Sequence, residues 1–260
     1  MASKILTRKA LLKNILRYRF LDIITCSLCI SLFLIPNILF NIFVGNTFLN
    51  QDYLLNVILV YAIKIILIMI FGVGISGAFY FFKKLVFSEG ASVRKDYFEG
   101  IRKNLKQFLI IYFWIGLLYG ILHVNIAILA HSNIDNNLSI IIIGIMYLIF
   151  GLFLIISIFM QTQSVIYVAT TYQLFKNALK FTIGKILINI ILLIALLFPL
   201  LLIEFIGGST IYYISIIILI FGYIGFSVLV YTLYSYSIFD QTINKSYYPE
   251  LIRRGLEDIE

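Results

Sequence analysis

Long apolar runs separated by short polar connections dominate this chain. Six runs exceed or approach the roughly 20 apolar residues that a transmembrane helix needs; they cover 20–44, 53–82, 107–130, 138–169, 181–206 and 211–239. The runs are continuously apolar rather than alternating, which argues against a membrane β-barrel. Backbone groups in hydrocarbon must pair within their own segment. The pattern therefore predicts an all-α membrane protein with six transmembrane helices in a single polytopic domain, residues 1–260.

The composition supports a membrane protein. Hydrophobic residues make up 62% of the chain and charged residues 12%, against about 45–50% and about 25% in an ordinary soluble domain. A soluble fold of this length has too little interior to bury so much apolar surface. The bilayer is therefore the expected solvent for most of the chain.

Positive charge alternates from one connection to the next. Apart from Lys64, the Lys and Arg residues all fall in 1–19, 83–106, 170–185 and 240–260, and the connections 45–52, 131–137 and 207–210 have none. Positively charged connections stay in the cytoplasm, so both termini are predicted to be cytoplasmic. The net charge of +8 then follows from topology, and no nucleic-acid partner is expected.

Chemistry-bearing motifs are scarce. Cys26 and Cys29 lie in the first run with no His beside them, so apolar packing is favoured over a redox or metal role. His123 and His131 have no carboxylate cluster around them, and no nucleotide-binding or hydrolase motif occurs. The sequence predicts a non-enzymatic protein without cofactor or metal. A cleavable signal peptide is not expected, because the basic segment before Phe20 is too long.

Two basic segments have amphipathic patterns. The first, 1–19, reads as a lead-in helix on the membrane surface. The second, 83–106, contains a predicted helix capped by Ser92, with an apolar stripe formed by Val93, Tyr97, Phe98, Ile101 and Leu105. This helix fits either the anionic inner leaflet of the bilayer or a membrane-protein partner, and the two roles are compatible.

A partial repeat links the second basic segment to another. Residues 101–108 and 174–181 share Lys, Asn and Phe at identical offsets, and both lead into an outward-going run. On the docking interpretation, Tyr97 and Phe98 anchor the partner, while Asn104 and Asn177 hold the two segments together.

Ionisable and small residues inside the runs are the remaining candidates. Lys64 and Glu204 fall at similar predicted depths near His123, so a Lys64–Glu204 pair is one hypothesis, and snorkelling of Lys64 to the outer interface is the alternative. Small residues let helices approach closely, and packing within the bundle is favoured over homodimerisation. The oligomeric state stays open. The candidate packing residues are Gly72, Gly74, Gly77, Gly116 and Gly120.

Short motifs beside these runs form a set. They are G-A-F-Y at 77–80, K-L-V at 84–86, D-Y-F at 96–98, K-N-L-K-Q at 103–107, L-F-K-N-A-L at 174–179 and L-I-P at 34–36. The set resembles the YesL-like family of bacterial integral membrane proteins, although G-I-S-G at 74–77 departs from that family's Gly-x-x-Thr/Ser-Ala pattern. The resemblance implies a plasma membrane protein of the Gram-positive type and a link to carbohydrate ABC importers. It supplies no catalytic residues.

Three functions are compatible with these features. The favoured one is an accessory or interaction partner of a transport system, with carbohydrate import implied by the resemblance alone. The second is a transport-active permease subunit that works with a separate ATPase. The third is an immunity protein against a membrane-active peptide.

Overall fold

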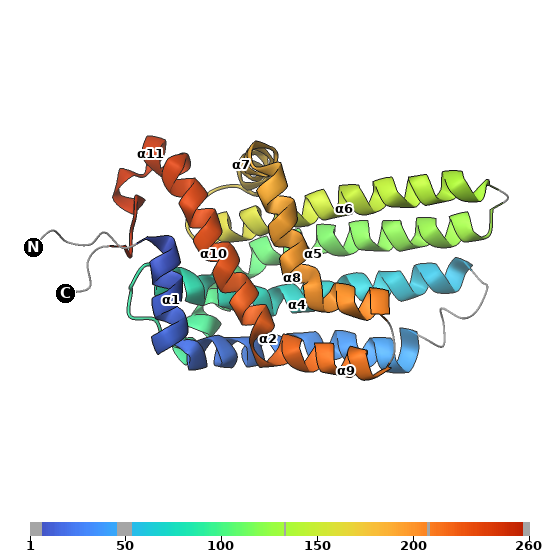
Figure 1. Cartoon of the computed structure of the whole chain (residues 1–260), viewed down its shortest axis with the longest axis horizontal. Helices are drawn as coiled ribbons and strands as arrows, with labels where there is room; N and C mark the ends of the chain where they lie inside the picture. The colour runs from blue at the N-terminus through green and yellow to red at the C-terminus, as the bar shows by residue number, and fades with distance from the viewer. Residues whose placement is uncertain (1–6, 46–53, 133, 207–208, 257–260) are drawn as a thin grey trace, which may run out of the picture.

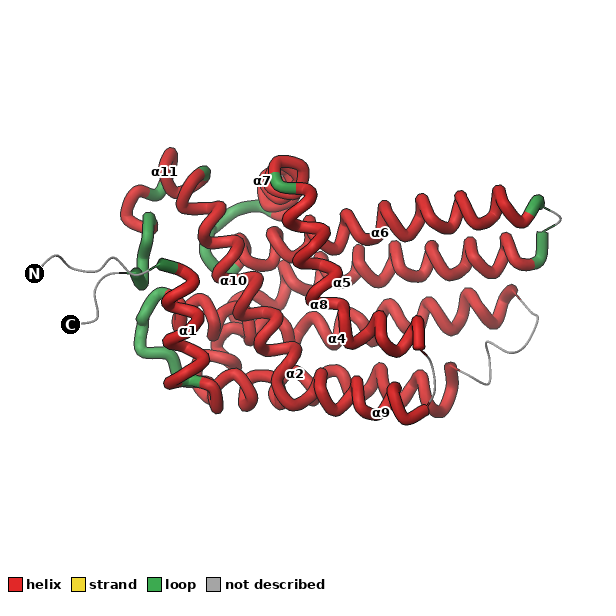
Figure 2. Tube along the Cα trace, in the orientation of Figure 1, coloured by secondary structure: helices red, strands yellow, loops and turns green. Residues whose placement is uncertain are grey.

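The computed structural model describes residues 7–45, 54–132, 134–206 and 209–256, and every regular element in those ranges is a helix (Figure 2). The elements in chain order are α1 (Arg8–Tyr18), α2 (Phe20–Phe40), the π-helical turn η1 (Asn41–Gly45), α4 (Leu54–Val86), α5 (Val93–Ala130), α6 (Asn136–Ser164), α7 (Thr171–Gly184), α8 (Ile186–Ile206), α9 (Ser209–Ile218), the π-helical turn η2 (Leu219–Tyr223), α10 (Ile224–Gln241), α11 (Ile243–Tyr247) and the 3-10 turn η3 (Pro249–Leu251). The predicted all-α class is confirmed.

The long helices run along one axis (Figure 1). Helices α2, α4, α5 and α6 are antiparallel to their chain neighbours, and α10 crosses this group obliquely. The helix α1, the α4–α5 turn, the α6–α7 connection and α11 gather at one end, which we call the basic end. The predicted Lys- and Arg-rich connections that the structure describes therefore lie together, and residues 131–132 and 134–135 lie at the opposite end.

Five described segments are long and apolar enough to cross a membrane, and a bent pair brings the number to six. The five are Phe20–Val44, Leu54–Val86, Val93–Ala130, Asn136–Ser164 and Ile214–Gln241. The third contains 38 residues in one uninterrupted helix. The predicted cytoplasmic helix and the predicted third span are thus a single rod, so the helix after Ser92 does not lie as a separate element on the membrane surface.

The predicted fifth span, 181–206, is not straight. Residues 181–184 end α7, which is bent by 96° from the start of α8. The buried side chain of Asn189 stabilises the bend: its Nδ2 donates to the carbonyl oxygens of Phe181 (3.2 Å) and Thr182 (3.1 Å), and its Oδ1 accepts from Tyr234 (2.8 Å). Apolarity alone does not reveal a bend that one polar side chain imposes.

The predicted sixth span, 211–239, is also broken. Gly222 leaves the helical conformation (φ 158°, ψ −25°) inside η2, between α9 and α10. Just beyond it, the backbone N–H of Gly225 donates to Ser27 Oγ at 2.8 Å, which brings α10 against α2. A Cβ at Gly225 would lie 2.7 Å from the carbonyl oxygen of Ile23. Only glycine allows this approach.

Helices α4 and α5 form the most closely packed pair. An added Cβ would lie 2.3 Å from Tyr112 Cγ at Gly72 and 2.6 Å from the carbonyl oxygen of Tyr97 at Gly77. In the opposite direction, Gly116 lies against the backbone of Ile65. Small residues thus let the two backbones approach. The other two predicted packing glycines also lie inside the bundle, Gly74 against Phe33 of α2 and Gly120 against Tyr61 of α4.

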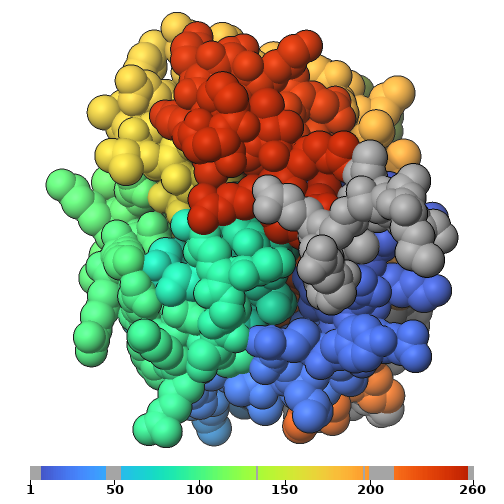
Figure 3. Space-filling model, turned by 90° about the vertical axis from the view of Figure 1, so that its left-hand side faces the viewer, coloured from blue at the N-terminus to red at the C-terminus, as the bar shows by residue number. Residues whose placement is uncertain are grey.

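The N-terminal helix docks on the basic end (Figure 3). Leu11 and Ile15 are each only 4% exposed, so part of the apolar face of this predicted membrane-surface helix packs against protein. Arg8 pairs with Asp240 of α10 at 2.8 Å. Asp240 also accepts from Asn244 (2.9 Å), whose Oδ1 accepts from Tyr167 (2.6 Å). This chain of polar contacts joins α1, α10, α11 and the α6–α7 connection.

Candidate functional site: a cavity between the spans

A cavity of about 530 Å³ lies inside the bundle. Its described lining comes from α2, η1, α4, α5, α6, α8, α9, η2 and α10, so nearly every long helix contributes. Ligand sites in proteins typically measure about 300–1,000 Å³ and occur between the helices of bundles. The cavity therefore has the size and the place of a small-molecule site.

Aliphatic and aromatic side chains form most of the lining. Leu34, Phe71 and Leu154 are typical members, contributed by α2, α4 and α6. Among the described residues that line the cavity, none carries a formal charge. The interior therefore suits an apolar molecule, because an ion in such surroundings would lose its hydration without gaining a counter-charge.

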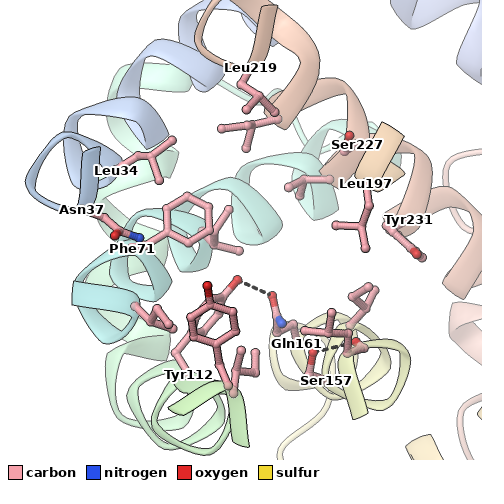
Figure 4. A pocket seen from close by; sticks show the side chains of 18 of the residues that line it. Leu34, Asn37, Phe71, Tyr112, Ser157, Gln161, Leu197, Leu219, Ser227 and Tyr231 are labelled. Carbon is pink, nitrogen blue, oxygen red and sulfur yellow. Dashed lines mark hydrogen bonds between the residues drawn. The ribbon is translucent and has the colours of Figure 1, made fainter. Parts of the chain in front are cut away.

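Neutral polar groups are grouped on a few helices (Figure 4). Tyr112 of α5 donates from its hydroxyl to Gln161 Oε1 of α6 at 3.3 Å. One turn along α6, Ser157 donates to the carbonyl oxygen of Leu154 at 2.7 Å. The Tyr112–Gln161 bond links the closely packed α4–α5 pair to α6, and it leaves the Nε2 amide hydrogens of Gln161 available to a further acceptor.

Helix α10 contributes two hydroxyl groups that have no hydrogen-bond partner among the described residues. Ser227 and Tyr231 are four residues apart, so they share one face of the helix, and both line the cavity. Their oxygen atoms are buried and have no hydrogen-bond partner among the described residues. A buried polar group without a partner costs about 1–3 kcal/mol. Both oxygens are enclosed by protein atoms, so they lie within the cavity wall rather than on its open surface.

Exposure changes along the cavity. Gln161, Tyr112 and Tyr231 are buried, at 3%, 7% and 7% exposure. Asn37 of α2 and Leu197 of α8, farther from the basic end, are half-buried. The end around Gln161, Tyr112 and Tyr231 is therefore the closed end, and the end around Asn37 and Leu197 is the more accessible one.

The floor of the cavity is tightly closed. Thr162 of α6 and Ser235 of α10 are both fully buried, and their side-chain oxygens form a hydrogen bond at 3.4 Å. Beside them, the rings of Phe159, Phe181 and Phe239 pack together, with Phe181 and Phe239 centroids 5.4 Å apart. This layer separates the cavity from the basic end.

A second polar cluster joins α4 and α5 at the basic end, beyond the apolar runs. Lys84 Nζ pairs with Asp96 Oδ1 at 2.7 Å. Asp96 Oδ2 accepts from the backbone N–H of Ser92 at 2.6 Å. The sequence predicted that the Ser92 side chain caps the helix, but that side chain makes no capping hydrogen bond. The Asp96 carboxylate instead accepts from the Ser92 backbone N–H.

Glu99 connects the same cluster to the solvent. Its carboxylate pairs with Lys103 Nζ at 2.6 Å and accepts from the Tyr80 hydroxyl at 3.1 Å. Hydrogen bonds from Lys103 and Tyr80 lower the pKa of Glu99 to about 2, and the hydrogen bond to Asp96 raises the pKa of Lys84. Each charge already has a partner, so the cluster stabilises the α4–α5 turn rather than forming a reactive site.

The predicted docking residues do not share one surface. Tyr97 is fully buried against Gly77, so it cannot offer its ring to a partner in this conformation. Phe98 is 51% exposed. Asn104 is buried and donates to the carbonyl oxygen of Gly100 in its own helix (2.9 Å), while Asn177 is half-buried on α7. Gln107 of the first segment donates to the carbonyl oxygen of Ala169, which lies in the α6–α7 connection before the second segment, at 3.2 Å.

The outer half of α4 carries the predicted ionisable group. Lys64 is half-buried, with its ammonium 4.9 Å from the centroid of the Tyr61 ring. That ring stacks on His123 at 4.8 Å, so Lys64 and His123 belong to one cluster. The side chain of Glu204 lies outside the described residues, and the Lys64–Glu204 pair stays a prediction.

The sequence interpretation missed the polar residues of the cavity because they are neutral. The residues expected to be functional inside the spans were Lys64, His123 and Glu204, and none of them is among the described residues that line the cavity. The available signal was the spacing: Ser157 and Gln161, and Ser227 and Tyr231, are each four residues apart inside apolar runs. That spacing places two polar groups on one helix face.

Among the described residues, no group of three or more His, Cys, Asp or Glu side chains is placed to hold a metal ion. Comparison with known proteins does not extend the assignment: no family model, curated protein or solved structure matches this chain. Sequence and structure together identify a multi-pass, all-helical membrane protein with a cavity between its spans.

Proposed function

We propose that this chain is a non-enzymatic membrane protein of a transport system, and that it holds a lipophilic molecule in the cavity between its spans. The observation that carries the proposal is the cavity itself, about 530 Å³ and apolar over most of its lining. It combines a closed end around Gln161 and Tyr231 with a more accessible end around Asn37 and Leu197. This favours the permease-type function over that of a purely structural accessory.

The broken helices on one side of the cavity support the same proposal. The closely packed α4–α5 pair forms one wall, while α8 and α10 on the opposite side follow the 96° bend and the break at Gly222. Helix breaks inside membrane proteins are tolerated where they line a cavity. Movement at such breaks would admit and release a ligand.

Photolabelling in proteoliposomes tests the proposal. The probe is an octadecane chain that carries a diazirine, and labelled peptides are mapped by mass spectrometry. We expect labelling of the cavity wall around Tyr112 and Gln161. Two bulky substitutions in that wall, Leu154→Trp with Leu193→Trp, should remove most of this labelling because they occupy the space the chain needs.

A matched control separates the cavity from the lipid-facing surface. Leu148 on α6 and Leu187 on α8 are 62% and 74% exposed, so Leu148→Trp with Leu187→Trp makes the same change on the outer face of the same helices. This variant should keep the wild-type labelling. Labelling that is confined to lipid-facing peptides in every variant would overturn the proposal.

An interaction role is the second candidate, and the exposure of Phe98 favours it. Phe98 is 51% exposed in the polar part of α5, and a large exposed aromatic residue beside charged groups suits a contact with another protein. The expected partner is the ATPase subunit of an importer, with carbohydrate import implied by the YesL-like resemblance. Phe98→Ala should abolish its co-purification, whereas Phe113→Ala, 40% exposed farther along α5, should not. Equal recovery with both variants would contradict this role.

We propose that the basic end faces the cytoplasm in a plasma membrane. The asymmetric distribution of Lys and Arg supports this orientation. In a chain with Cys26→Ala and Cys29→Ala, Ser132→Cys should react with a membrane-impermeant thiol reagent in intact cells, and Ser246→Cys should not. Reaction at Ser246→Cys in sealed cells would reverse the proposed topology.

A further inference from the structure

We propose that α7 lies in the membrane interface at the basic end and binds lipids with anionic headgroups. Lys176 and Lys180 contact the headgroup phosphates, and an apolar face of the same helix lies among the acyl chains. This surface is outside the cavity and does not depend on the proposed ligand-holding function.

The direction of α7 is that of a helix on a membrane surface. Residues Thr171–Gly184 are bent by 96° from the start of α8, and Figure 1 shows α7 across the long helices. Its 14 residues cover about 21 Å, less than the roughly 30 Å of a hydrocarbon core. Helix α7 is therefore too short and too strongly inclined to cross the bilayer.

The depth of α7 is that of the interface. The apolar run of α5 begins at Gln107, whose Nε2 donates to the carbonyl oxygen of Ala169, just before α7, at 3.2 Å. At the end of α6, Gln163 Nε2 donates to the carbonyl oxygen of Leu174 at 3.4 Å. The first half of α7 is thus level with the ends of two spans, where hydrocarbon gives way to headgroups.

Helix α7 presents three faces, because successive residues are turned by about 100°. The buried face, toward the protein, contains Leu174, Ala178, Phe181 and Thr182. A second face exposes large apolar side chains, which we call the α7 stripe: Tyr172, Phe175, Leu179 and Ile183. The third face exposes Gln173, Lys176 and Lys180. Protein, acyl chains and headgroups are the three surroundings that such a helix fits.

The charge of the third face specifies the headgroup. No Asp or Glu occurs between Asp135 and Glu204 in the sequence, and neither Lys176 nor Lys180 forms an ion pair with a described residue. By contrast, Lys84 pairs with a carboxylate at the same end. Lysines near a bilayer surface attract anionic lipids. The occupant that this face fits is therefore a lipid with a net negative headgroup.

Helix α1 is the contrasting case at the same end. It also exposes two lysines four residues apart, Lys9 and Lys13. Its Leu and Ile side chains are all buried or half-buried, so α1 has no counterpart of the α7 stripe. Exposed lysines alone do not mark a lipid surface. The combination of lysines with an adjoining exposed apolar face does.

Quenching of a single Trp by brominated lipids tests the proposal. Trp114→Phe removes the natural Trp, and Phe175→Trp places the reporter in the α7 stripe. Two reconstituted membranes contain the same mixture of phosphatidylcholine with a minority of phosphatidylglycerol. They carry equal amounts of bromine on the acyl chains, in one membrane on phosphatidylglycerol and in the other on phosphatidylcholine. Brominated phosphatidylglycerol should quench about fivefold more, the factor that corresponds to about 1 kcal/mol, the contribution of one lysine near a surface.

Matched variants link the preference to α7. Lys176→Gln with Lys180→Gln should make the two brominated lipids equal quenchers of the α7 reporter. Lys9→Gln with Lys13→Gln removes the same charge from α1 and should keep the full preference. With Trp114→Phe and Leu148→Trp, a reporter on the exposed outer face of α6, the two lipids should quench equally. Thermal unfolding in detergent verifies that each variant is folded.

Three outcomes would overturn the proposal. If neither lipid quenches the α7 reporter while both quench the α6 reporter, protein covers the α7 stripe, as a second copy of the chain would. Equal quenching of the α7 reporter by both lipids before any lysine is changed would show a bilayer contact without selection of headgroups. Loss of the preference in Lys9→Gln with Lys13→Gln would show that it follows net charge rather than α7.

Discussion

The two sides of the bundle differ in how closely their helices approach. Helices α4 and α5 meet through glycines, with distances that leave no room for a Cβ at Gly72 or Gly77. On the other side, α6, α8 and α10 surround a cavity of about 530 Å³, and both described breaks of the long helices, at Lys185 and Gly222, occur there. We call the closely packed α4–α5 pair the frame; the other side contains the cavity and both breaks.

This difference indicates where function resides. A tightly packed pair resists deformation, because interiors at native density have few voids to absorb movement. A space bounded by bent helices and unpaired hydroxyls has the opposite character. Ligand binding is therefore expected to perturb α8 and α10 and to leave the α4–α5 pair in place.

The largest effect is expected from a substitution that breaks the frame. Gly77→Val places a Cβ only 2.6 Å from the backbone carbonyl oxygen of Tyr97. A backbone group cannot move aside as a flexible side chain does, so the free energy of unfolding should fall by about 3 kcal/mol. Thermal unfolding in detergent measures the loss.

The same substitution on the opposite side is the control. Gly144 of α6 has no heavy atom within 4 Å of an added Cβ, so Gly144→Val should be close to neutral. Equal destabilisation by both variants would mean that the α4–α5 contact is not special, and the comparison of the two sides would lose its basis.

An intermediate loss of stability is expected from a substitution at the bend between α7 and α8. Asn189→Ala removes the two bonds to the carbonyl oxygens of Phe181 and Thr182 and leaves the Tyr234 hydroxyl without its acceptor. Buried groups left unpaired cost about 1–3 kcal/mol. Asn125→Ala removes only one bond, to Ile121 within α5, and should cost less. A smaller loss for Asn189→Ala than for Asn125→Ala would show that Asn189 does not stabilise the bend.

The smallest effect is expected from the charged cluster at the α4–α5 turn. The pKa of Glu99 is lowered from 4.5 to about 2, so its ionised form is stabilised by folding. This contribution is fully present above about pH 4.5 and is lost as the pH falls toward 2. Glu99→Gln should therefore flatten the decline of the unfolding temperature between these values. An identical pH profile for wild type and variant would show that the pair is thermodynamically silent, as many exposed ion pairs are.

Local patterns predicted the parts of the fold that local forces determine. Run length and continuity indicated helices of membrane-spanning length, and the clustering of Lys and Arg indicated which connections share an end of the bundle. The stripe around Tyr97 was less informative. Its members are spaced as one apolar face, yet Tyr97 is buried and Phe98 is half exposed, because the face that meets α4 is centred on Tyr97, Gly100 and Asn104.

The cavity required the tertiary structure. No local pattern marks Gln161 as a cavity residue. It becomes one through its hydrogen bond with Tyr112, which is 49 residues earlier in the chain. Ser227 and Tyr231 look like ordinary polar residues of a span until their surroundings show that no described partner reaches them.

The sequence by itself determined that the chain is helical, that it belongs in a bilayer, and that its positive charges gather at one end, since hydropathy and charge act through the nearest solvent. Only the tertiary structure decided where the spans bend, which glycines meet a backbone, and which neutral side chains face an open space. Those properties depend on distances between helices. Such distances arise from the packing of residues far apart in the chain, and no local pattern records them.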